Sequence, residues 1–320
     1  MKKLLLSAFV AMTVLPAMAD LEGDGYYRVQ NAITKRYAYL LDNKGSMNAS
    51  TSSVDVRALE LFLGFAKASS DPSTVFYIDK VPDSKSEYNI EGQGTSLYKF
   101  LKKYMYVMDG KEIDGQMSYY AYGKDSGLTK YLGDLNSSLT EEEGMASADV
   151  NGDRRLWYIH PVIADTDNSY FGVAPTLTSK GKYYAPMYAG FPYDAYSEGV
   201  KFYTVSGVYP LGDTPAVCIK EVKGVIPSGT AVIIECANPL PVDNKLNVGP
   251  EGAAADVKGN MLKGVYFENY GKIHKNLTPY DRKTMRILTV KDGQLVFDVA
   301  DIENLPRNQA YLQLTGDDQY

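Results

Sequence analysis

Few side chains in this sequence are of the types that carry out covalent or metal chemistry. The chain has two histidines, His160 and His274, and two cysteines, Cys218 and Cys236. These four residues form none of the spaced ligand sets that bind zinc. The sequence also has no nucleophile elbow, phosphate-binding loop or dinucleotide fingerprint. We therefore expect no enzyme activity and no cofactor. A secreted hydrolase with a Ser-His-Asp triad assembled from distant segments is kept as an alternative.

Acidic side chains suggest two further chemistries, and each has an ordinary explanation. Paired carboxylates hydrolyse glycosides, but the densest acidic run, residues 141–143, lies among Ser, Thr and Gly and is typical of a solvated loop. Asp149, Asn151 and Asp153 have the spacing of the first calcium ligands of an EF-hand loop. Arg154 stands where that loop needs glycine, so we interpret the segment as a hairpin turn without metal.

Tyrosine dominates the aromatic residues, with 27 Tyr against 10 Phe and one Trp. Side chains alternate between the two faces of a strand, so Tyr120 and Tyr122 share one face of a predicted strand at residues 118–122. A polar loop follows at residues 123–125. Aromatic rings beside hydrogen-bonding groups are what a sugar site needs. The alternative is that this face of the strand is buried in the core.

A second aromatic cluster lies in a loop rich in Pro and Gly, where we expect exposed side chains. Tyr193 and Tyr196 belong to this cluster, beside Asp194. The predicted ligand-binding residues are therefore Tyr120, Tyr122, Tyr193 and Tyr196.

The two cysteines lie in neighbouring apolar segments, residues 216–222 and 231–236, on either side of a turn around Pro227. If the segments form a hairpin, Cys218 and Cys236 face each other, and an oxidising compartment permits a disulfide between them. A register slip of one residue forbids that bond. Two buried free thiols are the alternative.

The N-terminus predicts export. Lys2 and Lys3 precede an apolar run at residues 4–14, and small residues at 17 and 19 suit cleavage after Ala19. The apolar run is too short to span ~30 Å of hydrocarbon, which argues against a membrane anchor. We expect a signal peptide at 1–19 and a soluble mature protein in the periplasm, on the cell surface or outside the cell.

The charge of the chain disfavours two classes of partner. The whole sequence has 33 basic and 39 acidic side chains, and removal of Lys2 and Lys3 leaves 31 against 39, or −8. An acidic surface repels the phosphates of nucleic acid and of anionic lipids. We expect neither nucleic-acid binding nor membrane insertion.

The pattern along the first half of the chain is one of short strands separated by turns. Asp109-Gly110 and Asp114-Gly115 are dipeptides typical of hairpins. One segment departs from the pattern: Ser52 to Asp55 resembles a capping box, and the apolar residues at 59, 62, 63 and 66 have helical spacing. We predict one short helix there. The predicted strands are 26–30, 37–41, 75–81, 88–91, 104–108 and 118–122.

A boundary between two domains is expected near residue 178. Residues 157–159 and 170–173 are interpreted as the last hairpin of the first domain, because a stretch rich in Pro, Thr, Ser and Gly follows at 174–182. About 300 mature residues also favour two domains. The strands predicted after the boundary are 199–205, 216–222, 231–236, 265–269, 286–290, 295–299 and 309–314.

Residues 25–31, Gly-Tyr-Tyr-Arg-Val-Gln-Asn, followed by Lys-Arg-Tyr at 35–37 and Leu-Leu-Asp at 40–42, resemble the opening repeat of ricin-type β-trefoil domains. Residues 76–78 and 157–159 are similar to the aromatic-x-Ile strands that close trefoil repeats. The sequence lacks the Gln-x-Trp element of that family, so the family's sugar-contacting residues have no counterpart here. The resemblance implies a β-trefoil-like first domain.

The second half is similar to a β-sandwich module at the C-terminus of large exported proteins from gut Bacteroidetes. The matching phrases are Glu-Gly-Val-Lys-Phe-Tyr at 198–203, Ile-Pro-Ser-Gly-Thr-Ala-Val-Ile at 226–233 and Leu-Pro-Arg-Asn-Gln-Ala-Tyr-Leu at 305–312, with Tyr-Tyr-Ala-Pro at 183–186. In such phrases Pro sets the entry of a turn, and Gly or Asn accepts a positive φ. The resemblance implies a role in structure or surface presentation.

Together these observations predict an all-β protein: a signal peptide at 1–19, a β-trefoil-like domain at 20–178 and an antiparallel β-sandwich domain at 179–320. The expected function is non-catalytic binding or adhesion outside the cytoplasm, directed at glycan or another surface polymer. An interaction module that docks onto envelope proteins through its sandwich is the second hypothesis, and a secreted hydrolase is the third.

Overall fold

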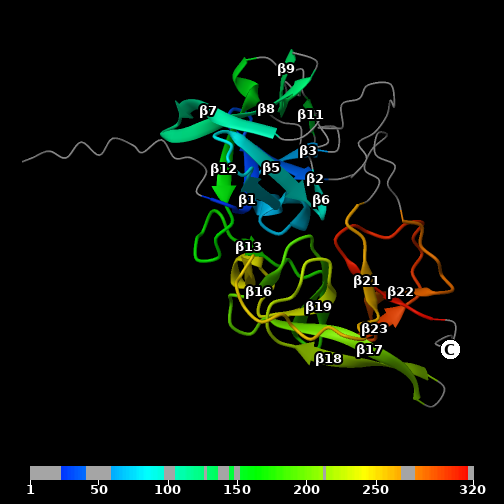
Figure 1. The fold of residues 1–320 in the computed structure, drawn as a ribbon. Coiled ribbons are helices and arrows are strands. Elements are labelled where there is room, and N and C mark those ends of the chain that lie inside the picture. The colour runs from blue at the N-terminus through cyan, green and yellow to red at the C-terminus, as the bar shows by residue number, and fades with distance from the viewer. Residues whose placement is uncertain are drawn as a thin grey trace, which may run out of the picture.

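The computed structural model describes residues 23–40, 59–96, 105–125, 128–135, 144–147, 152–211, 214–267 and 278–315. The chain is 51% strand and 6% helix, so the predicted all-β class is confirmed. The proposed signal peptide lies outside the described residues. Within those residues no helix is long and apolar enough to cross a membrane. Figure 1 shows two groups of sheets, one above the other.

Six strands of the first group form a closed ring of antiparallel pairs, which we call the barrel. The first residues of β1 pair with β4 and its later residues pair with β12, and this double pairing closes the ring. The order around the ring is β1-β4-β5-β7-β8-β12. These strands are β1 (Gly25–Asn31), β4 (Phe76–Lys80), β5 (Glu87–Gly92), β7 (Met105–Ile113), β8 (Gln116–Asp125) and β12 (Leu156–Pro161).

Inward-facing side chains of the ring make the barrel core. Trp157 is fully buried at its centre and donates its indole N–H to the Leu132 carbonyl at 3.0 Å. Tyr119 and Ala121 of β8 point into the same core, as strand alternation requires. Short strands outside the ring extend the sheet: β2 (Arg36–Leu40), β3 (Leu59–Leu63), β6 (Thr95–Ser96), β9 (Leu128–Tyr131), β10 (Gly133–Asp134) and β11 (Gly144–Ser147).

The predicted helix is wrong at residues 59–63. Residues Leu59–Leu63 form β3, which pairs with β2 on one side and β11 on the other, and among the described residues of this segment the helical ones are Phe65–Ala68 (α1). Apolar residues at 59, 61 and 63 alternate as well as they follow a helical period, so the sequence pattern is ambiguous. The two flanking strands decide the outcome because they satisfy the backbone hydrogen bonds. The proposed capping residues at 52–55 lie outside the described residues.

The two hairpin dipeptides behave differently. Asp114 and Gly115 both have positive φ, 53° and 79°, and join β7 to β8 as predicted. Gly110 instead lies inside β7, where the register with β8 shifts between Asp109 and Glu112. A Cβ on Gly110 would come within 2.4 Å of the Leu156 side chain, so glycine there permits close packing rather than a turn.

The second group, which we call the layered half, stacks three antiparallel sheets (Figure 1). The middle sheet has the order β14-β15-β19-β17-β18, with β13-β20-β16 on one side and β21-β24-β22-β23 on the other. The strands are β13 (Phe171–Gly172), β14 (Leu177–Ser179), β15 (Lys182–Tyr188), β16 (Tyr193–Ala195), β17 (Lys201–Leu211), β18 (Thr214–Val222), β19 (Ala231–Cys236), β20 (Lys245–Val248), β21 (Leu262–Gly264), β22 (Met285–Lys291), β23 (Gln294–Asp298) and β24 (Ala310–Gln313). Three short 3₁₀ turns are described: Pro72–Thr74, Gly152–Arg155 and Pro241–Asp243.

The strand β19 is buried on both faces, as expected for a strand in the middle sheet. Ala231 and Ile233 pack into the core beneath β21, β22 and β24, whereas Val232 and Ile234 pack into the core that contains Phe171 and Leu246. A continuous apolar run is typical of a strand that is buried on both faces. The sequence predicted this strand with its observed bounds.

Two strand predictions near the edges of the layered half are wrong. Phe171 does not return to β12 as a hairpin, because β13 pairs with β20. The strand expected at 265–269 is absent from its described residues, 265–267, and the nearby strand β21 ends at Gly264. In both cases the partner strand is far away in sequence. The turn chemistry is confirmed: Gly229 and Asn308 have φ values of 71° and 57°.

Candidate functional site

The tyrosines predicted to bind ligand on β8 lie together on the outer face of the barrel. Tyr119 and Ala121 point into the core, so Tyr120 and Tyr122 point the other way and stay partly exposed. Their face of the strand is therefore not the main core. Tyr120 does rest on a small cluster that includes Leu156.

A third ring completes the surface. Tyr131 of β9 lies directly across from Tyr122, with ring centroids 5.4 Å apart and planes tilted by 38°. It also meets Tyr120 edge-on at 5.5 Å. We call Tyr120, Tyr122, Tyr131 and Arg155 the tyrosine platform, and all four are partly exposed.

Arg155 ends the 3₁₀ turn Gly152–Arg155 and lies over two of these rings. The central carbon of its guanidinium is 4.4 Å from the Tyr131 centroid and 5.4 Å from the Tyr120 centroid. Its Nε–H is buried and has no hydrogen-bond partner among the residues that the structure describes. Leaving a buried donor unpaired costs about 1–3 kcal/mol. The stacking on tyrosine offsets part of that cost, since a guanidinium is attracted to an aromatic face.

An acidic group lies near the opposite end of the platform. Burial raises the pKa of the Tyr122 phenol, and the neighbouring Tyr131 and Glu87 raise it further. Glu87 belongs to β5, which pairs with β7, and β7 pairs with β8. The platform therefore has aromatic faces in its middle, a cation at one end and a carboxylate toward the other. Such an arrangement can stack on a sugar ring and bond its hydroxyls.

The second predicted tyrosine cluster is divided between core and surface. Tyr193 is completely buried, packs against Phe191 and Phe202, and has a phenol whose pKa burial raises. The expectation that Tyr193 is exposed is wrong, because β16 pairs with β20 and turns this ring inward. Tyr196 is 48% exposed and lies outside the platform. Its role as a ligand-binding residue stays a prediction.

The predicted disulfide is wrong, because both cysteines are free. The hairpin on which it depended does not form: β18 pairs with β17, and β19 lies on the far side of β17. Two strand spacings alone put at least about 9–10 Å between the Cα atoms of Cys218 and Cys236. The register adds to that distance, because Cys218 pairs with Gly207 whereas Glu235 pairs with Lys201 near the start of β17. A disulfide needs Cα atoms within about 7 Å. Cys218 is exposed and Cys236 is buried. Burial, with Glu235 nearby, raises the pKa of the Cys236 thiol to about 12, so this thiol is unreactive in the native state.

His160 lies on β12 between the rings of Tyr37 and Tyr158. Its Nε2 is 3.0 Å from the Gln30 side-chain oxygen, and its Nδ1 is 3.5 Å from the Gln116 amide nitrogen. Burial, followed by the charges of Arg28 and Lys35, lowers the pKa of His160 to about 4. A neutral imidazole held by two amides is a structural arrangement. His274 and the residues of the acidic run at 141–143 lie outside the described residues, as do Asp149 and Asn151 of the calcium-like segment.

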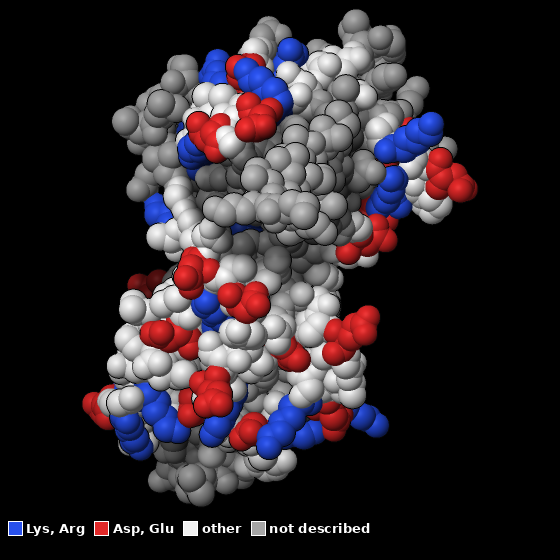
Figure 2. All heavy atoms as spheres, turned by 90° about the vertical axis from the view of Figure 1, so that its left-hand side faces the viewer, with Lys and Arg blue, Asp and Glu red and all other residues white. Residues whose placement is uncertain are grey.

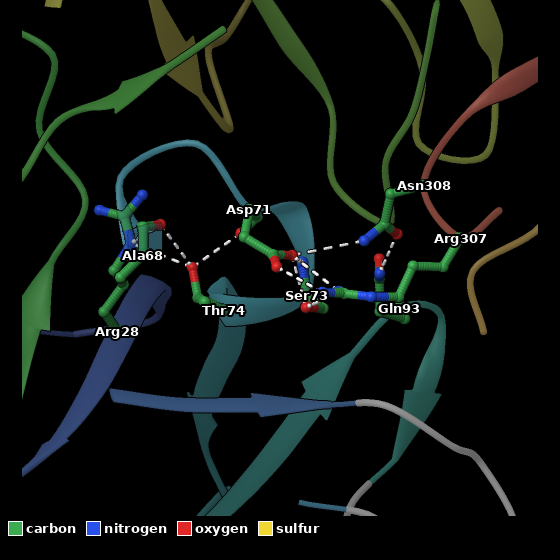
Figure 3. A network of polar contacts seen from close by, with 8 residues as sticks. All are labelled: Arg28, Ala68, Asp71, Ser73, Thr74, Gln93, Arg307 and Asn308. Atoms are coloured by element: carbon green, nitrogen blue, oxygen red, sulfur yellow. Dashed lines mark hydrogen bonds and ion pairs between the residues drawn. The ribbon is translucent and has the colours of Figure 1, made fainter. Parts of the chain in front are cut away.

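No sequence pattern predicted the polar network that joins the barrel to the layered half. The guanidinium of Arg307 bonds both carboxylate oxygens of Asp71, at 3.0 and 2.7 Å, and stacks on Tyr39. Burial opposes ionisation of Asp71, but Arg307 and Ser73 outweigh it and lower the pKa of that carboxyl. Figure 3 shows these contacts between segments of the two halves.

Two buried amides continue the network. Gln93 of the barrel donates to the Asn308 side chain, and Asn308 reaches toward Asp71 at 3.4 Å. A cleft of about 590 Å³ lies beside these groups and is lined by residues of both halves, among them Lys67 and Met187. The charged groups of the network already bond one another. We therefore interpret the network as a structural connection between the barrel and the layered half.

Arg28 anchors the other end of the same region. It is fully buried, and its guanidinium donates to the carbonyls of Ala68 and Tyr170 at 3.1 and 2.9 Å and to the Thr74 hydroxyl at 3.1 Å. Burial lowers the pKa of Arg28 to about 10. This arginine belongs to residues 25–31, the segment that resembles the opening repeat of ricin-type β-trefoil domains. Its contacts are structural, because they hold α1 and the loop before β13 against β1. Figure 3 shows the contacts near Ala68 and Thr74.

The surface charge is mixed. On the face drawn in Figure 2, acidic and basic side chains lie next to each other, without a broad patch of one sign. No group of three or more His, Cys, Asp or Glu residues suited to hold a metal ion occurs among the residues that the structure describes. No protein-family model, curated protein or solved structure matches this chain.

Proposed function

We propose that this chain is an exported binding or adhesion protein without catalytic activity, and that it recognises glycan or another surface polymer through the tyrosine platform. The observation that carries the proposal is the contiguous row of Tyr120, Tyr131 and Tyr122 on the outside of the barrel. Three partly exposed rings with a cation and a carboxylate beside them favour sugar recognition over simple packing.

The platform has the rigidity that such a site needs. Tyr120 and Tyr122 stand on β8, a strand of the closed ring, and Tyr131 is paired to it across the sheet. Rings that are already ordered lose little freedom when a ligand binds. Tyr196, the other exposed tyrosine predicted from the sequence, lies just after the end of β16 and not on a strand of the ring.

Glycan-array binding by the purified mature chain tests the proposal. Tyr122→Ala removes the ring that Arg155 does not overlie, and we expect it to weaken binding at least tenfold, since each stacked aromatic contributes strongly to a shallow site. Tyr209→Ala is the matched control, because Tyr209 is 57% exposed on β17, away from the barrel. Thermal melting shows that each variant is folded. Equal binding by wild type and Tyr122→Ala contradicts the proposal.

A second function is favoured by one edge of the middle sheet. β18 is an outermost strand of that sheet, and its Ile219 side chain is 56% exposed. An open edge can accept a strand from another protein, which supports docking onto envelope proteins. Pro215 and the bulge at Ser206 in the neighbouring β17 weaken such pairing, so this function ranks second. Cross-linking from a photoreactive label on the exposed Cys218 in an envelope extract distinguishes it from glycan binding.

We also propose a finer architecture, in which a β-trefoil-like domain precedes a sandwich-type domain. The closed six-strand ring, with the β2–β3 and β10–β11 pairs outside it, supports a β-trefoil-like first domain within the proposed range 20–178. The last residues of that range pack with the layered half, because β13 pairs with β20 and β14 pairs with β15. Sheets stacked on both faces of β19 support a sandwich-type second domain at 179–320. The likeness to exported proteins of gut Bacteroidetes is consistent with export and surface presentation. A hydrolase remains the third hypothesis, and turnover on a panel of glycosides, esters and peptides is its test.

A further inference from the structure

The charge of Arg155 has no counterion among the described residues. Its terminal nitrogens make no hydrogen bond or ion pair there, and the guanidinium rests on Tyr120 and Tyr131 alone. Its neighbours in the same 3₁₀ turn are accounted for: Asp153 pairs with Lys111, and Arg154 donates to the Leu135 carbonyl at 3.3 Å. Arg155 is thus set apart as a partly buried cation on an aromatic surface.

We propose that the tyrosine platform selects glycans that carry a carboxylate, such as those built from uronic or sialic acids, and that Arg155 receives the carboxylate. This inference rests on the proposed function and names the class of ligand for it. The sugar ring stacks on Tyr122, beside the Tyr131 ring that Arg155 overlies, while its carboxylate meets the terminal nitrogens of Arg155.

The chemistry of the guanidinium fits this ligand. A planar guanidinium can form two parallel hydrogen bonds to a carboxylate, and it sheds water more readily than an ammonium group does. The rings of Tyr120 and Tyr131 hold Arg155 in place before the ligand arrives, so little further ordering is needed. The terminal nitrogens are the accessible donors, because only Nε is enclosed and unpaired.

The far end of the platform suits the remainder of such a sugar. Glu87 acts on Tyr122 electrostatically, so it lies near the ring that is farther from Arg155. A carboxylate can accept hydrogen bonds from sugar hydroxyls but repels a second carboxylate. This asymmetry favours a single orientation, with the acid group at Arg155 and the hydroxyls toward Glu87.

The test compares acidic oligosaccharides with their own carboxyl-reduced forms, which keep the linkage and length but replace each carboxylate with a hydroxymethyl group. Oligogalacturonates, oligomannuronates and sialyllactose are suitable probes. Calorimetry on the full mature chain should show at least tenfold tighter binding to the acidic form of at least one probe. That preference should fall as salt concentration rises, since an exposed ion pair is screened.

Variants assign the preference to one side chain. Arg155→Gln should bring the affinity for the acidic probe down to that for its reduced form. Arg155→Lys should restore only part of it, because lysine keeps the charge but loses the planar fork. Arg154→Gln removes the same charge one residue away and should change affinity less than twofold.

Each other outcome has a definite meaning. If acidic and reduced forms bind equally, or if Arg155→Gln binds like wild type, the carboxylate assignment is overturned. The proposed function still stands in that case, provided that Tyr122→Ala abolishes binding. If neither acidic nor reduced glycans bind to the folded wild type, both proposals fail together.

Discussion

The barrel and the layered half bury different kinds of side chain. Among the buried polar residues described, Arg28, Arg36 and Asp134 are charged, and all three belong to the barrel half. Those of the layered half, Ser179, Thr204, Asn244 and Asn308, are uncharged. The layered half relies on strands such as β19 that are apolar on both faces, whereas the barrel half holds its peripheral loops with buried ions. We infer that loss of a single polar partner damages the barrel more than the layered half.

The largest predicted effect comes from the buried ion pair of the barrel. Arg36 bonds Asp134 at 2.9 and 2.8 Å, and both side chains are completely buried. Asp134→Ala removes the carboxylate that bonds this buried arginine charge, and we expect a loss of about 4 kcal/mol in the free energy of unfolding. The exposed pair between Lys35 and Asp114 is the control. Asp114→Asn removes the charge but keeps a side chain that tolerates the positive φ of this turn, and it should cost about 0.5 kcal/mol.

Two residues of the chain can be used to follow the unfolding of the two halves separately. The only tryptophan, Trp157, is buried in the barrel, and the unreactive Cys236 is buried in the layered half. In Asp134→Ala we expect Trp157 fluorescence to change at a lower urea concentration than in wild type. Alkylation of Cys236 should be affected less. If both probes shift equally, the two halves unfold as one unit and the comparison drawn above does not hold.

A smaller effect is expected from pH. The pKa of His160 is about 4 in the folded chain and about 6.5 when unfolded. Between these values the unfolded chain binds more protons, so stability falls as pH drops from 6.5 to 4 and levels off below that range. The pKa difference corresponds to about 3 kcal/mol, and partial exposure of the ring reduces this to about 2 kcal/mol.

His160→Gln isolates this contribution, because glutamine does not titrate. Urea unfolding at pH 4.5 and pH 7 should show a smaller difference in stability for the variant than for wild type. An unchanged difference would assign the pH dependence to the carboxylates, for example Asp71, whose pKa is lowered in the folded state.

The smallest effect is expected where the two halves meet. Asp71 and Arg307 are each less than a fifth exposed and are bonded bidentately. A double-mutant cycle with Asp71→Asn and Arg307→Gln should give a coupling energy of about 1 kcal/mol. Without the pair, the Trp157 and Cys236 transitions should separate further. Coupling near zero would show that apolar contacts, such as Val75 in the core of the layered half, join the halves by themselves.

Local pattern predicted much of the candidate site. Strand alternation alone placed Tyr120 and Tyr122 on one face, because neighbouring side chains on a strand point in opposite directions. Arg155 could not be found this way, since its contacts with Tyr120 and Tyr131 cross between separate segments. A chain rich in tyrosine also gives no sign of which rings are buried, and Tyr193 was predicted on the wrong side for that reason.

The sequence by itself determined the all-β class, most strand positions and the turn at Asp114-Gly115, since these depend on side-chain alternation and on backbone angles of single residues. The tertiary structure decided which strands pair. It put β17 between the two cysteines, gave Phe171 to β20 and made a strand of residues 59–63. It also brought Asp71 to Arg307. Backbone hydrogen bonds are alike in every strand, so partners are chosen by burial across the whole fold, which no short segment encodes.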